Sequence, residues 1–304
     1  MNTTRLWIMA ALVLTLLGGC SSSSSAQPQS NSLNVLATES FLGDIARNVA
    51  GNRVKVDVLL PVTVDPHEFE PRPQDITRLE QSQVLIVNGL GYEAWLQKTL
   101  DSLGGQRLVI VATNGLAANP DPSGEHPLGD PHMWMDPLKV INYVDQIQQG
   151  LSQADPGGKA IYAQNAAAYI SQLKDLDRWV KDQVRQLPPE KRLLVTNHDA
   201  LGYFAQAYDF KIIGAVIPSV SPDVSPSAQQ LAGLIDTIRK SGAPAIFLDI
   251  GENPKLADQV ASETGVKVVT DLYVETTSGP DGPAPTYIDM IKYDVNRIIS
   301  ALKQ

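Results

Sequence analysis

DPGGKAIYAQNAAAYISQLKDLDRWVKDQVRQLPP, residues 155–189, is the stretch that decides the fold. Asp155 and Pro156 are typical of a helix N-terminus, with aspartate as the N-cap and proline at the first helical position. Apolar or aromatic residues then recur every three or four positions, as on one face of a helix, at 162, 166, 169, 173, 176, 180, 184 and 187. Because Pro188 and Pro189 end this pattern, the sequence predicts one helix over residues 156–187. Such a helix is about 48 Å long, which is enough to lie along two lobes and to restrict their closure.

Short β-rich runs alternate with helical patterns on both sides of this helix, which is typical of βαβ units and parallel sheets. The strands are expected at 33–38, 54–61, 83–89, 108–112, 193–198, 211–217, 245–250 and 266–270. Helices are expected at 41–50, 73–81, 93–103, 227–241, 254–264 and 286–302. We therefore predict an α/β protein with two similar lobes, residues 33–155 and 188–304. Each lobe has a four-stranded parallel sheet with flanking helices, and the long helix joins them.

The first 19 residues have the features of a secretory signal peptide. One charge, Arg5, precedes an apolar run over residues 6–17, which is shorter than the roughly 20 residues of a membrane span. The tetrapeptide Leu17-Gly18-Gly19-Cys20 resembles the bacterial lipobox, which implies that Cys20 is lipidated and begins the mature chain. Residues 20–32 then form a flexible, serine-rich tether. We expect an extracytoplasmic protein, anchored by lipid to the outer face of the cell membrane, or in the periplasm where a second membrane exists.

The composition excludes two classes of site. Cys20 is the only cysteine, so neither an intrachain disulfide nor a thiolate metal ligand is possible. The formal net charge is −9, and no run of lysine or arginine indicates a nucleic-acid surface.

Three of the four histidines are spaced almost evenly along the chain and lie in similar loop-like settings. His67 and His132 each end the tripeptide Asp-Pro-His, and nearby prolines restrict the backbone around both. His198 ends the apolar run that starts at Leu193, at the carboxyl end of an expected strand, where open α/β sheets bind their ligands. Because imidazole is the commonest metal ligand, three histidines that converge would form a transition-metal site.

These segments also resemble a known family. DPHEFEP at 65–71, DPHMWMDP at 130–137 and HDALGYF at 198–204 are similar to the metal-binding segments of the zinc/manganese solute-binding proteins of ABC transporters. Residues 272–293 resemble the C-terminal signature of that family. The resemblance implies two α/β lobes joined by one long helix, with a metal ion held between them by His67, His132 and His198.

The resemblance also implies a carboxylate as the fourth ligand. The family usually has an aspartate near the start of the C-terminal signature, and this position falls on Glu275. Asp271 and Glu252 are the alternatives. We expect His126 to be an exposed bystander, whereas Asp65, Asp136 and Asp199 adjoin the histidines and either orient imidazoles or form caps and turns.

We therefore expect a protein, not an enzyme, that captures Zn(II), with Mn(II) as the alternative, and delivers it to an ABC permease and its ATPase. It should be a monomer that binds no nucleic acid. A zinc hydrolase is one alternative, but His67-Glu68 does not continue into the H-E-x-x-H motif because residue 71 is proline. Three histidines with a carboxylate would also close the coordination shell that a catalytic zinc leaves open to water. A surface adhesin with a structural metal site is the other alternative.

Overall fold

The computed structural model describes residues 33–62, 64, 66–67, 69–121, 124, 126–217 and 226–303. Cys20, the signal sequence 1–19 and the tether 20–32 lie outside these residues, as does Asp65. Within the described part of the chain, no helix is long and apolar enough to cross a membrane.

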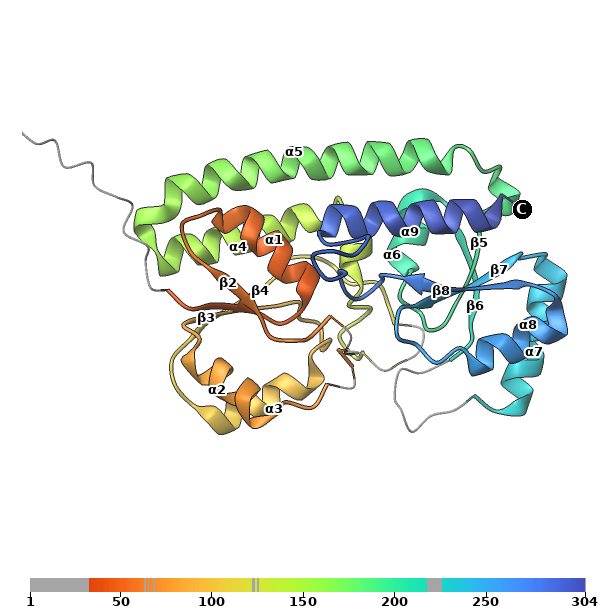
Figure 1. Cartoon of the computed structure of the whole chain (residues 1–304), viewed down its shortest axis with the longest axis horizontal. Helices are drawn as coiled ribbons and strands as arrows, with labels where there is room; N and C mark the ends of the chain where they lie inside the picture. The colour runs from red at the N-terminus through yellow and green to blue at the C-terminus, as the bar shows by residue number, and fades with distance from the viewer. Residues whose placement is uncertain are drawn as a thin grey trace, which may run out of the picture.

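Two four-stranded parallel sheets form the framework of the protein (Figure 1). The first has the order β2-β1-β3-β4 and consists of β1 (Val35–Ala37), β2 (Val56–Val58), β3 (Val84–Val87) and β4 (Leu108–Val111). The second has the order β6-β5-β7-β8 and consists of β5 (Leu193–Thr196), β6 (Lys211–Ala215), β7 (Ala245–Asp249) and β8 (Lys267–Leu272). The two orders are the same pattern, so the prediction of two similar parallel sheets is confirmed.

Helices cover both faces of each sheet, which is why the strands are apolar on both sides. In the first sheet, Val35, Ala37 and Ile86 face the main core, whereas Leu36 and Leu85 face the opposite layer. The helices of this half are α1 (Ser40–Ala50), α2 (Pro73–Gln81), α3 (Ala94–Leu103) and α4 (Val140–Ala154). In the second half they are α6 (Gly202–Tyr208), α7 (Ala228–Ser241), α8 (Lys255–Thr264) and α9 (Tyr287–Leu302).

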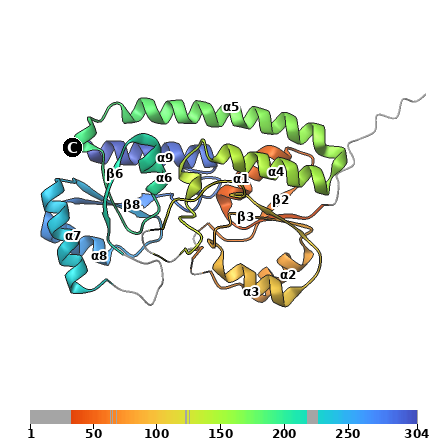
Figure 2. The same ribbon diagram turned by 180° about the vertical axis from the view of Figure 1, so that it is seen from behind.

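The long helix α5 (Lys159–Val184) lies along both halves, with α9 beside it (Figures 1 and 2). It packs on α1 and α4 at one end and on α6 and α9 at the other. Its apolar stripe, including Tyr162, Tyr169 and Leu173, belongs to one core that contains residues of both sheets. The two halves therefore share a continuous hydrophobic core, and restricted closure of the two lobes stays a prediction.

The long helix is shorter than predicted at both ends. Residues 156–158 form a 3₁₀ turn, because the glycines at 157 and 158 have low helix propensity. At the other end α5 stops at Val184, and the chain continues with tighter i→i+3 bonds, from Gln186 N–H to the Gln183 carbonyl (3.1 Å) and from Leu187 N–H to the Val184 carbonyl (2.9 Å).

Asp155 does not cap the helix as predicted. Its carboxylate accepts hydrogen bonds from Arg53 (2.7 and 3.0 Å) and from the Tyr162 hydroxyl (2.7 Å). An arginine about a hundred positions earlier in the chain therefore takes the carboxylate that a local N-cap would have used. The sequence analysis also specified no helix at α4 or α6, although α4 has a clear apolar repeat at Val140, Val144, Ile147 and Leu151.

Candidate metal centre

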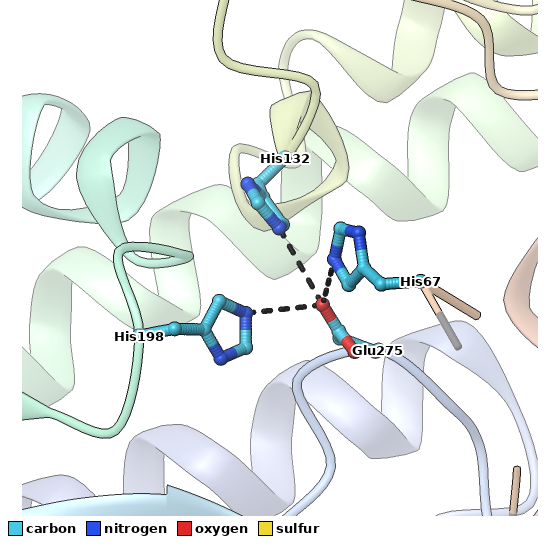
Figure 3. A group of neighbouring side chains, drawn as sticks. All are labelled: His67, His132, His198 and Glu275. Carbon is cyan, nitrogen blue, oxygen red and sulfur yellow. Dashed lines mark hydrogen bonds and ion pairs between the residues drawn. The ribbon is translucent and has the colours of Figure 1, made fainter. Parts of the chain in front are cut away.

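Four side chains that are far apart in the sequence converge between the two sheets (Figure 3). His67 lies in the loop between β2 and α2, and His132 immediately precedes the 3₁₀ helix η1 (Met133–Met135). His198 follows β5 and Glu275 follows β8. Each half thus contributes two side chains, and the two in the second half lie at the carboxyl ends of strands, where ligands of open α/β sheets bind.

The ligand atoms lie at the separations that a small cation needs. Glu275 Oε1 is 3.1 Å from Nε2 of His67, 3.1 Å from Nε2 of His198 and 3.4 Å from Nε2 of His132. One ligand atom from each of the four residues lies within 4.8 Å of all the others. In a tetrahedral zinc shell with N and O ligands at the usual bond lengths, neighbouring ligand atoms are about 3.3 Å apart. The four side chains could therefore hold a divalent cation after small adjustments.

Asp130 orients the His132 ring. Its Oδ1 lies 2.8 Å from His132 Nδ1 and also accepts a hydrogen bond from the His132 backbone N–H (2.9 Å). A carboxylate at Nδ1 holds a proton on that nitrogen, so Nε2, which faces Glu275, is the atom that would bind a metal ion. Asp130 belongs to the same Asp-Pro-His tripeptide as His132, but an orienting role was expected only of Asp65, Asp136 and Asp199.

Two of the aspartates that were named can be placed. Asp136 Oδ1 accepts the backbone N–H of Leu138 (2.9 Å), so it has a turn role. Asp199 is mostly buried, and burial raises its pKa, with the charge of Asp130 adding to the effect.

The backbone that carries Glu275 is fixed from both halves of the protein. Asp249, at the end of β7, accepts the N–H groups of Val274 (2.8 Å) and Glu275 (3.3 Å). Trp134 Nε1 donates to the Val274 carbonyl (2.7 Å) from η1. Sequence reasoning did not identify either residue as part of the site, because no local pattern relates them to position 275.

The charges at the site are complementary to one another. Burial would raise the pKa of Glu275, but the positive charges of His67 and His198 and hydrogen bonds to imidazole hold it well below its usual range. Burial would lower the pKa of His132, but Asp130 and Glu275 outweigh it and raise that pKa to about 9. The carboxylate is therefore an anion that stabilises positive charge on the imidazoles, and a bound dication would replace their protons.

Neither of the two alternative carboxylates belongs to the group of four converging side chains. Asp271 accepts hydrogen bonds from the Tyr293 hydroxyl (2.8 Å) and from Arg297 (2.7 and 3.0 Å). Glu252 Oε1 lies 3.7 Å from Nδ1 of His198, whereas Nε2 is the atom that faces Glu275. Of the three carboxylates considered, Glu275 is the one grouped with the three histidines.

His126 differs from the expectation of an exposed bystander. Its side chain is half-buried, and its ring centroid lies 5.5 Å from that of His67 and 6.2 Å from that of His132. The backbone N–H of His126 donates to Asp121 Oδ2 (2.7 Å). The turn residues around His126 in the sequence predicted a loop, but they could not show which way it folds.

Comparison with known proteins gives consistent matches over nearly the whole chain. The manganese-binding lipoprotein MntA of Halalkalibacterium halodurans is 32% identical over 294 residues, which cover 96% of both chains. The iron-binding protein YfeA of Yersinia pestis is 31% identical over 89% of this chain and 86% of its own. The solved structure of the periplasmic zinc-binding protein TroA of Treponema pallidum superposes with a TM-score of 0.80 at 27% identity, over 88% of this chain and 98% of that one.

The family comparison covers both halves of the molecule. The model of the ZnuA family, described as zinc-uptake complex component A, periplasmic, matches residues 35–301. This range includes all four converging side chains and both sheets. The chain therefore belongs to the ZnuA family of periplasmic zinc-uptake components.

Proposed function

We propose that this protein is the extracytoplasmic solute-binding component of a metal ABC transporter. It captures a divalent cation between its two lobes, residues 33–155 and 188–304, and delivers it to the permease, which the transporter ATPase drives. The convergence of three Nε2 atoms and one carboxylate oxygen carries this proposal. Family membership and the names of the relatives support it.

The proposed ligands are His67, His132, His198 and Glu275. All four side chains are at most about 7% exposed, so a bound cation would be removed from bulk water. Four protein ligands fill a tetrahedral shell and leave no position for a reactive water, which disfavours the zinc hydrolase. A structural site in an adhesin would not require ligands on loops of two separate lobes.

Zn(II) is the proposed cargo and Mn(II) is the alternative. Three imidazoles and one carboxylate suit zinc, whereas manganese prefers more oxygen ligands. The names of the relatives include manganese, iron and zinc, so they support a transition metal without choosing one. Because zinc outbinds manganese at most mixed nitrogen/oxygen sites, zinc should displace manganese in competition at neutral pH.

We further propose that the mature protein is a monomer anchored to the membrane through a lipid on Cys20. The lipobox-like segment and the lipoprotein relatives support the anchor. Cys20→Ala should release a protein that still binds metal. A variant that stays in the membrane fraction at the wild-type level would refute the anchor but leave the metal site untouched.

The decisive experiment for the function is native mass spectrometry combined with elemental analysis of the purified protein. One zinc per chain is expected, and it should be lost in His67→Ala, His132→Ala and His198→Ala while the proteins remain folded. Wild-type metal content in all three variants would refute the proposed site.

A further inference from the structure

A second cluster of buried polar groups lies at the carboxyl end of β1. The hydroxyl oxygen of Thr38 is 2.6 Å from Glu39 Oε2, 3.1 Å from Glu93 Oε1 and 3.1 Å from the Ile86 carbonyl oxygen. Thr38, Glu39 and Glu93 are 0%, 1% and 7% exposed, so bulk water does not solvate the two carboxyl groups. Neither carboxyl group is among the four proposed metal ligands.

The number of hydrogens in this cluster does not match the number of acceptors. A threonine hydroxyl has one hydrogen to donate, while carbonyl and ionised carboxylate oxygens only accept. With both glutamates ionised, one hydrogen would serve three acceptors, and two buried negative charges would face each other across one oxygen atom. A second proton on one of the carboxyl groups removes the repulsion, because that group is then neutral and donates to the lone pair of the Thr38 hydroxyl. The Thr38 hydrogen is left with two acceptors, Glu93 Oε1 and the Ile86 carbonyl oxygen, each of which also accepts a backbone N–H.

The hydrogen bonds identify which glutamate holds this proton. Glu93 accepts the backbone N–H groups of Asn88 (2.5 Å) and Gly89 (3.1 Å), as expected of an anion. Glu39 Oε1 has no hydrogen-bond partner among the described residues and is fully buried. Glu39 therefore fits a neutral acid, with its proton on Oε2 directed at Thr38 and its carbonyl oxygen on the other side.

We propose that Glu39 carries a proton in the metal-free protein and releases it to solvent when a divalent cation binds at the His67, His132, His198 and Glu275 site. The release step rests on the proposed function, whereas the protonation of Glu39 does not.

The charges that face Glu39 from the surrounding elements explain the coupling. Burial raises the pKa of Glu39 well above its ordinary value, and the negative charges of Glu93 and Glu275 raise it further. Tyr143, on α4, is close enough for the charges of both glutamates to raise its pKa, and its hydroxyl donates to Asn88 Oδ1 (2.6 Å). The segments that carry the two glutamates are also hydrogen-bonded to each other: the hydroxyl of Ser40, next to Glu39, lies 3.0 Å from Thr276 Oγ1 and accepts the backbone N–H of Thr277 (2.8 Å). A dication bound to Glu275 would therefore replace the repulsion of ionised Glu39 by attraction. Ionised Glu39 would then compensate part of the charge of the cation.

Proton release on zinc binding tests the coupling directly. Titration calorimetry with Zn(II) in buffers of different ionisation enthalpy measures the number of protons released per cation. Glu39→Gln is isosteric with the neutral acid, so it should bind zinc but release up to one proton fewer than the wild type. Glu80→Gln, a change at an exposed glutamate of α2, is the matched control and should release the wild-type number. An equal number of protons from Glu39→Gln and the wild type would overturn the coupling.

The stability of the metal-free protein tests the protonation of Glu39 independently of zinc. A carboxyl group with a raised pKa in the folded state contributes stability at low pH that is lost as the pH rises toward that value. Relative to Glu39→Gln, the unfolding constant of the wild type should therefore increase up to tenfold per pH unit above the ordinary carboxyl range. Parallel curves for the two proteins would show that Glu39 is ionised, which overturns the proposal.

Two further outcomes are distinguishable. If zinc binds to no form of the protein, the proposed function and the release step both fail, while the stability comparison still decides where the proton lies. If Glu39→Gln does not fold, Glu39→Met provides a second neutral side chain of similar length for the same two measurements.

Discussion

Asp130→Asn should weaken metal binding without removing any ligand. Asp130 Oδ1 contacts both the backbone N–H and Nδ1 of His132, and the imidazole is only 3% exposed, so water cannot replace the carboxylate. An asparagine side chain keeps an oxygen in this position but loses its charge. The ring should therefore stay in place while Nε2 becomes a poorer donor to the metal.

The expected size of the effect follows from the type of hydrogen bond that changes. A bond to a charged group contributes about 1.5–3 kcal/mol and a neutral one about 0.5–1.5 kcal/mol. The difference, roughly 1–1.5 kcal/mol, corresponds to about a tenfold loss of affinity. Asp130→Ala also removes the acceptor, so its loss should approach the upper end of the roughly 10–100-fold range typical of such partners.

The assay is competition for Zn(II) against a chromogenic chelator at fixed pH, with thermal unfolding of the metal-free proteins to check the fold. Asp136→Asn is the matched control, because Asp136 lies four positions after His132 and its Oδ1 accepts the N–H of Leu138. The control should bind zinc within about twofold of the wild-type affinity. This change is well below the roughly tenfold loss expected when a residue that orients a metal ligand is altered, as in Asp130→Asn. Equal affinities for Asp130→Asn and Asp136→Asn would refute the orienting role of Asp130.

Three further outcomes are expected. Glu275→Ala should abolish tight zinc binding, measured by the same competition. Asp271→Ala should leave zinc binding nearly unchanged, because Asp271 is hydrogen-bonded to Tyr293 and Arg297. The reverse order of effects would identify Asp271 as the ligand. Burial raises the pKa of Asp294 to about 8, so its contribution to stability is present at low pH and falls by about 1.4 kcal/mol per pH unit between about pH 4 and 8. Asp294→Asn should flatten that part of the unfolding profile of the metal-free protein, and an unchanged slope would count against a neutral Asp294. Trp134→Phe removes the donor to the buried Val274 carbonyl and should cost about 1–3 kcal/mol in unfolding. Trp95→Phe is its control, since the Trp95 indole nitrogen has no hydrogen-bond partner among the described residues. Equal losses of unfolding free energy in the two variants would mean that the hydrogen bond from Trp134 to Val274 contributes little.

The sequence by itself determined the fold class and most of the strands and helices, because these depend on local spacing, although α4 and α6 were not predicted and α5 is shorter than expected. Apolar residues repeat every three or four positions along α5, and β-rich runs separated by helical patterns favour parallel strands joined by crossovers. The histidines could also be selected from the sequence, since the repeated Asp-Pro-His tripeptide and the position of His198 after a strand are local features. Their role as metal ligands, together with that of Glu275, remains a prediction that the mutations above will test.

Only the tertiary structure decided which groups meet across long stretches of chain. Asp155 serves Arg53 instead of capping the next helix, and His126 folds back beside His67, because packing between distant segments outweighs local preference. The same reason applies to Glu39 and Glu93, which are 54 positions apart in the sequence and share the Thr38 hydroxyl. Spacing along the chain predicts which face a residue occupies, but the charges and hydrogen-bond partners that it meets there depend on the folding of both sheets around one core.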